Sequence, residues 1–213
     1  MKRLAVALAV LLIYPPGSNN VGRAQQIDHE MKSNAKSDSS HPRHDKKGSA
    51  VTKIKADTTV AGKVVAPQVA SSIKEIVQRY VQLKNSLVAD KSNEAAAAGK
   101  EMVDAMGKLD KSRFIADQKK LYEDVEDDAR EHAEHIGANA DNIKHQREHF
   151  DLLSKDMYDL VKVFGSGQVL YKDFCPMYNG KKGAMWLSET KAIKNPYYGK
   201  QMPTCGSVQE ELK

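Results

Sequence analysis

Sulfur-bearing side chains gather near the C-terminus of the chain. Both cysteines lie there, in the segments 175–177 (CPM) and 202–205 (MPTC), and each has a methionine two or three residues away. Thiolates and thioethers are soft, polarisable ligands that suit Cu(I), whereas Mg²⁺ and Ca²⁺ prefer oxygen. A proline restricts the backbone of each segment. The pattern therefore predicts a Cu(I) site whose candidate ligands are Cys175, Met177, Met202 and Cys205.

The same two cysteines support a second interpretation. Two cysteines in an exported protein most often form a disulfide, because compartments outside the cytoplasm are oxidising. A bond between Cys175 and Cys205 would close a loop of about 30 residues and contribute roughly 3–4 kcal/mol in the chain-entropy model. The residue types leave the disulfide and the metal site both open, and a redox-active pair would be compatible with both.

Four histidines form a second group of possible ligands. The spacing places His132 and His135 at the end of one predicted helix, and His145 and His149 at the start of the next. A short loop joins these helices, so the two turns face each other and His132 can meet His149. Neutral imidazoles bind copper or zinc, which makes His149 a possible extra ligand. The competing interpretation is one half-buried histidine bonded to a carboxylate and three exposed histidines.

Several functional classes are excluded by composition and motifs. A hydrophobic content of 40% with 29% charged residues is typical of a soluble globular chain. Residues 68–213 carry 22 basic and 23 acidic residues. This nearly neutral balance provides no positive electrostatic potential that would attract phosphate groups, so we expect no nucleic-acid partner. The sequence contains no Glu-x-x-His, His-Glu-x-x-His, Gly-x-Ser-x-Gly, P-loop or Gly-x-Gly-x-x-Gly motif. We therefore predict a binding protein and not an enzyme.

The first 24 residues have the layout of a secretory signal. A positively charged start (MKR) precedes an apolar run over residues 4–14, and the small residues Gly22 and Ala24 suit cleavage after Ala24. The apolar run is too short to cross a bilayer, which needs about 20 residues. We predict a cleaved signal peptide over residues 1–24, a periplasmic location, and no membrane span after cleavage.

Residues 25–67 are predicted to be a disordered polar linker. Their Ser/Lys-rich first part has no apolar periodicity and cannot bury enough surface to offset the entropy of ordering. The three histidines of this linker lack a fixed geometry, which favours a solvated tail over a metal scavenger. Residues 51–66 are more apolar and are consistent with a short strand, a packed arm or further linker.

The elements that must position the candidate ligands are mostly helical. Apolar residues recur three and four positions apart, as at Ile73, Ile76 and Tyr80, which indicates helices with one buried face. Short connections make neighbouring helices antiparallel, so the predicted fold class is all-α, an antiparallel up-down four-helix bundle. The four predicted helices span about 68–91, 93–109, 116–136 and 141–164, with Ser92 as the predicted N-cap of the second.

The C-terminal segment, residues 165–213, differs from the helices in being rich in loops and aromatic residues. Residues 169–178 and 184–187 flank a glycine-bounded turn, which predicts a short β-hairpin. So large an aromatic area is expected to pack over the end or side of the bundle. We predict one domain over residues 68–213, made of the bundle and this Cys/Met-containing segment.

The order of motifs in the chain resembles an uncharacterised bacterial exported family, the domain of unknown function three-three-four-seven. The resemblance covers about residues 70–211. The matching motifs are LVAD at 87–90, QREHF at 146–150, LS at 153–154, DFCPM at 173–177, MWLS at 185–188, IKNPYYG at 193–199, Met202, and CG at 205–206.

This resemblance implies a metal-linked role outside the cytoplasm. Members of the family occur alone behind a signal peptide, or fused to periplasmic adaptor subunits of copper and heavy-metal efflux pumps. The resemblance thus implies a periplasmic metal-linked accessory domain with copper as its metal. Together with the Cys/Met pattern, it leads us to predict a periplasmic accessory protein that holds Cu(I) for sequestration or delivery, with an efflux adaptor or another envelope protein as partner. The alternative is a disulfide-stapled envelope interaction module without metal.

Overall fold

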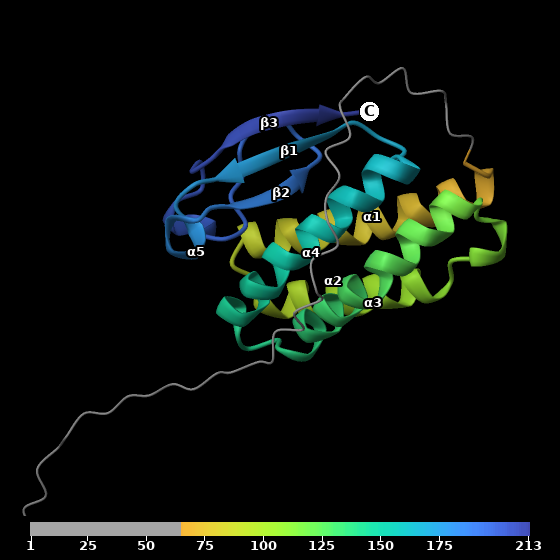
Figure 1. Ribbon diagram of the computed structural model, residues 1–213. Coiled ribbons are helices and arrows are strands. Elements are labelled where there is room, and N and C mark those ends of the chain that lie inside the picture. Colours follow the sequence, from red (N-terminus) through yellow and green to blue (C-terminus); the bar gives the residue numbers. More distant parts are fainter. Residues whose placement is uncertain (1–64) are drawn as a thin grey trace, which may run out of the picture. The chain divides into compact units, whose positions relative to one another are not determined.

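The computed structural model describes residues 65–213 (Figure 1). The predicted signal peptide and all but the last three residues of the predicted linker lie outside the described residues, and those predictions stay untested. Within the described part, no helix is both long enough and apolar enough to cross a membrane.

Four long helices account for most of the described chain, and each begins and ends within a few residues of its predicted bounds. Pro67 occupies the first turn of the first helix, where its missing N–H costs nothing. Gly165 follows the last helix with a φ of 76°, a conformation that favours glycine. The four helices are α1 (Pro67–Val88), α2 (Ser92–Gly107), α3 (Ala116–Ala138) and α4 (Ile143–Phe164).

Consecutive long helices pack against one another, α1 with α2, α2 with α3, and α3 with α4. Their buried faces carry the apolar residues recognised in the sequence, and Ile73, Ile76 and Tyr80 are each at most 1% exposed. Gly99 on α2 lies so close to α3 that an added Cβ would stand 2.9 Å from the Ala133 carbonyl oxygen. A glycine is needed there to let the two helices approach.

The C-terminal segment contains a three-stranded antiparallel sheet. The predicted hairpin is present, as β1 (Leu170–Cys175) paired with β2 (Ala184–Ser188). A third strand, β3 (Ser207–Leu212), pairs with the other edge of β1, and the sequence analysis did not predict it. The described chain is therefore predominantly helical with a small sheet, and not purely α. The remaining short elements are η1 (Lys111–Arg113), α5 (Tyr178–Lys181) and η2 (Gly199–Gln201).

The sheet is attached to the helices mainly through β2, which packs on α4 and α1 (Figure 1). Tyr80 of α1 is central to this junction, because its hydroxyl accepts a hydrogen bond from Leu187 N at 3.0 Å and lies 2.8 Å from Ser154 Oγ. The ammonium of Lys84 is fully buried and donates to Glu189 at 2.6 Å. These bonds hold the C-terminal segment on the helices, as its aromatic content predicted.

Candidate metal centre

The α3–α4 connection places four histidines at one end of the helical pair. His132 and His135 lie in the last turns of α3, and His145 and His149 in the first turns of α4. Asparagines fix both ends of the loop: Asn139 Nδ2 donates to His135 O at 2.8 Å, and Asn142 Oδ1 accepts from His145 N at 3.2 Å. Such caps satisfy terminal backbone groups and fix where each helix ends and begins.

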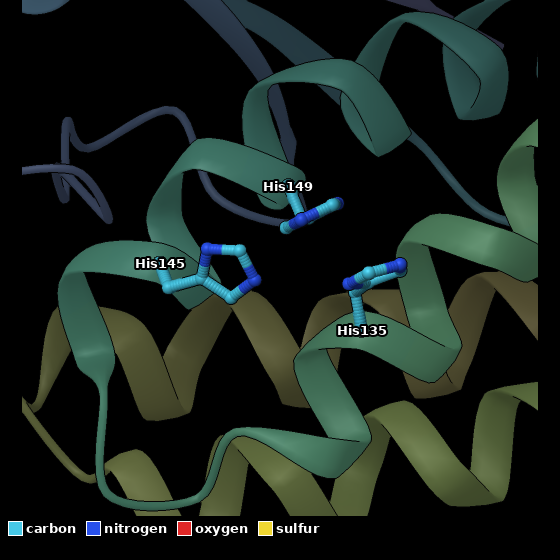
Figure 2. Close-up of side chains that lie close together, drawn as sticks. All are labelled: His135, His145 and His149. Carbon is cyan, nitrogen blue, oxygen red and sulfur yellow. The ribbon is translucent and has the colours of Figure 1, made fainter. Parts of the chain in front are cut away.

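Three of these imidazoles converge. One ring nitrogen from each of His135, His145 and His149 lies within 4.8 Å of the other two. Figure 2 shows His145 and His149 projecting from α4 toward His135 of α3. The rings of His135 and His149 are stacked with centroids 4.3 Å apart, and His145 meets His149 edge-on at 4.5 Å. We call His135, His145 and His149, together with His132, the histidine cluster.

The spacing of the cluster suits a transition-metal ion. With metal–nitrogen bonds of about 2.0–2.1 Å, tetrahedral coordination places ligand nitrogens about 3.3 Å apart. The three rings are half-buried, so a bound ion would be partly shielded from water while the cluster stays open to ion entry.

His132 supports the cluster from the α3 side. Its Nδ1 lies 3.2 Å from His149 Nδ1, which confirms the predicted meeting of these two side chains. Burial lowers the pKa of His132, although the charges of Glu131 and Asp128 oppose this shift. A neutral imidazole offers one donor and one acceptor nitrogen, which a hydrogen bond between two histidines requires.

Carboxylates stand just outside the cluster. Glu131 lies 3.8 Å from His135 Nε2, and Glu148 lies 3.7 Å from His145 Nδ1. Both are exposed and favour a cation between the helices only weakly. All four histidines are partly buried, and the side chain of His135 is 39% exposed.

The two cysteines meet at the end of the sheet. Cys175 closes β1 and is buried, Cys205 is half-buried, and their Sγ atoms lie 2.8 Å apart as free thiols. The side chain of Asn195 secures the loop that carries Cys205, donating to Cys205 O at 2.7 Å. The hydrogen bond with Cys175 raises the pKa of Cys205 to about 11, so that thiol is protonated at neutral pH. We call Cys175 and Cys205 the thiol pair.

The five ligands predicted from the sequence are thus distributed over two places. Cys175 and Cys205 come together, whereas His149 belongs to the histidine cluster. The side chains of Met177 and Met202 lie at the surface, 45% and 36% exposed. The predicted ligand set named His149 but neither His135 nor His145. His132 and His135 are three residues apart before the short loop, and His145 and His149 are four residues apart after it. This spacing is the sequence signal that groups the histidines.

The comparison with protein families found one match. Residues 76–169 match the family described as "Protein of unknown function (DUF3347)", which confirms the family resemblance seen in the sequence. The matched segment includes the whole histidine cluster and ends before the thiol pair. No curated protein and no solved structure matches the chain.

Proposed function

Residues 76–169 belong to a family of unknown function, DUF3347, and from this starting point we propose that the protein is a metal-binding accessory protein. Its principal metal centre is the histidine cluster. Its cargo is copper, held for sequestration or delivery and not for catalysis.

The convergence of three imidazoles carries this proposal. His135, His145 and His149 come from two long helices, and their ligand nitrogens already lie within 4.8 Å of one another. Three neutral imidazoles form a set that binds zinc or copper, with a fourth position left for water or a donor from a partner. Among divalent first-row ions such a site binds Cu²⁺ most tightly, which favours copper over zinc where both are available.

The cellular setting is part of the proposal. The signal-like start of the sequence supports a periplasmic location. The family resemblance supports an efflux adaptor or another envelope protein as the partner that supplies or receives the metal. We also propose that α1–α4 form an antiparallel up-down four-helix bundle, which the packing of consecutive helices supports.

The thiol pair supports a second candidate function. Two thiols 2.8 Å apart, with Met177 and Met202 nearby in sequence, suit Cu(I) bound by sulfur. The same contact equally suits a disulfide that staples the C-terminal segment, and the protein would then be an interaction module without metal at that place. Either role is compatible with a separate nitrogen site at the histidine cluster.

A metal titration of the full chain tests the principal proposal. We would measure the dissociation constants of Zn²⁺ and Cu²⁺ by competition with a chromophoric chelator. His149→Ala removes the imidazole that contacts the rings of both His135 and His145. We expect at least a 100-fold loss of affinity for both ions. The matched control replaces the three histidines outside the described residues, His29, His41 and His44, with alanine, and we expect it to keep the high-affinity site.

Two results would count against the proposal. If the His149→Ala variant binds both ions like the parent, the cluster is not the metal centre. If the control loses binding and His149→Ala does not, the metal is held by the N-terminal histidines. Thermal unfolding of each variant without metal shows whether the helices remain folded.

A further inference from the structure

A cavity of about 620 Å³ lies between α4 and the C-terminal segment. Its walls come from one face of α4, from α5, and from the loop that leads into η2. This volume is within the range of sites that enclose small organic ligands. Neither the proposed metal centre nor the thiol pair lines this cavity.

Three tyrosines give the cavity its shape. Tyr178 stacks on Tyr197 with ring centroids 4.4 Å apart, and the ring of Tyr198 stands perpendicular to that of Tyr178 at 5.9 Å. The hydroxyls of Tyr197 and Tyr198 donate to the backbone carbonyls of Met185 and Met177. These two rings are thereby held in place, so the aromatic corner exists before any ligand arrives.

The residues of α4 that line the cavity include two carboxylates. Asp151 is 5% exposed, and its buried Oδ1 receives no hydrogen bond within the described chain. Lys155 approaches that oxygen to 3.4 Å, as an ion pair without hydrogen-bond geometry. Glu148 adds a second carboxylate to the lining. Burial, followed by the charges of Glu148 and Asp151, raises the pKa of Tyr178 to about 12.

The positive charges of the lining are largely accounted for. The guanidinium of Arg147 donates to Asp90 at 2.6 Å, to Leu87 O at 3.0 Å and to Pro196 O at 2.8 Å. Its charge is therefore balanced, and three of its donor groups are occupied. Lys144 is exposed, so solvent screens its ammonium. The carboxylates of the lining are Asp151, which is buried and lies beside Lys155, and Glu148, whose side chain is 54% exposed.

We propose that this cavity binds a small organic ammonium ion. Aromatic rings set at right angles attract a cation through their negative faces, and a buried carboxylate supplies the opposite charge. A transition-metal ion would not use the ring faces, and the two carboxylates disfavour an anion. No histidine lines the cavity, so its ligand would be recognised by Tyr178, Tyr198 and Asp151, although Glu148 of the lining also lies 3.7 Å from His145.

The test compares a cation with its neutral isostere. Choline and 3,3-dimethylbutan-1-ol have nearly the same shape and differ in the charged nitrogen. We would titrate each into the full chain carrying ¹³C-labelled tyrosine and follow the ring resonances by NMR. Choline is expected to shift the Tyr178 and Tyr198 signals and to bind at least about tenfold more tightly than the alcohol. Equal affinities, or no shift with choline up to 50 mM (roughly the weakest affinity of interest), would overturn the proposal.

Substitutions then locate the site. Asp151→Asn and Tyr198→Leu are each expected to weaken choline binding about tenfold. Asp159→Asn on α4 and Tyr171→Leu on β1 are the matched controls, since neither residue lines the cavity, and both should bind like the parent. If the controls weaken binding as much as the cavity variants, the proposal is wrong. The His149→Ala variant should bind choline normally, which separates this test from that of the metal centre.

Discussion

The histidine cluster and the thiol pair are built on different kinds of scaffold. The cluster lies on two long helices joined by a short capped loop, and four half-buried rings reach one another across it. The thiol pair joins the end of a strand to an irregular loop, and one of its members is fully buried. The cluster therefore brings three ligand nitrogens within 4.8 Å of one another at a partly open surface, whereas the thiol pair is positioned to connect two parts of the chain.

Because of this difference, substitutions in the two regions should affect different measured properties. Changes in the histidine cluster are expected to appear in metal affinity, because its side chains contribute little to the apolar core. Changes in the thiol pair are expected to appear in stability, because it joins the loop before β3 to β1. The redox state of the thiol pair and the role of His132 test this distinction directly, and the buried charge of Asp156 tests the helices that carry the cluster.

The largest effect is expected from the redox state of the thiol pair. Oxidation of Cys175 and Cys205 to a disulfide would close a loop of 30 residues and raise the free energy of unfolding by about 3–4 kcal/mol. Denaturant unfolding of the unmodified chain with and without reductant measures this difference. Cys205→Ser should show no dependence on reductant, and Zn²⁺ affinity should be the same in all samples. A chain equally stable in both conditions would show that the pair is not a staple.

A smaller effect is expected from Asp156, a half-buried residue of α4 whose Oδ2 is buried without a hydrogen bond in the described chain. Burial, with the nearby charges of Asp128 and Asp159, raises the pKa of Asp156 to about 7, against the attraction of Lys155. The unfolded chain loses this proton above about pH 4, whereas the folded chain keeps it to about pH 7. The free energy of unfolding of the parent should therefore fall as the pH rises from about 4 to 7.

Asp156→Asn removes this titration. The variant should gain on the order of 2 kcal/mol of stability relative to the parent between pH 4 and pH 8. Denaturant unfolding at several pH values measures the gain, and the exposed Asp127→Asn is the control. A constant difference between variant and parent across this range would show that Asp156 ionises in the folded state as it does in the unfolded chain.

The smallest effect is expected from His132, which we interpret as positioning His149 and not as a ligand. A hydrogen bond from His149 Nδ1–H to His132 Nδ1 would fix the tautomer of His149 and direct its Nε2 lone pair to the metal. His132→Leu removes the acceptor and should weaken Zn²⁺ binding about tenfold, without loss of stability. His132→Gln retains an acceptor and should recover part of the affinity. A loss of more than 100-fold with no recovery by glutamine would instead make His132 a ligand.

The sequence was most informative where regular periodicity decides the structure. The apolar stripes predicted four helices, and the same periodicity predicted that His132 and His149 would meet. The third strand was missed because the segment 207–212 (SVQEEL) has mostly polar side chains. Its place is decided by pairing with the free edge of β1, which is a long-range effect.

Long-range contacts also explain what the sequence left open at the sites. The ion pair between Lys84 and Glu189 joins residues 105 positions apart and buries a lysine within an apolar stripe. The approach of Cys175 to Cys205 depends on the loop around Asn195, for which no periodicity exists. The exposure of Met177 and Met202 likewise follows from loop geometry and could not be read from their spacing to the cysteines.

The central claim is that the principal metal centre is made of imidazole nitrogen. Zinc K-edge X-ray absorption of the full chain, loaded with one equivalent of Zn²⁺, tests it most directly, because zinc does not oxidise the thiols. We predict a nitrogen shell at about 2.0 Å with the multiple-scattering pattern of histidine rings. A sulfur shell at about 2.3 Å would contradict the account and assign the metal to the thiol pair.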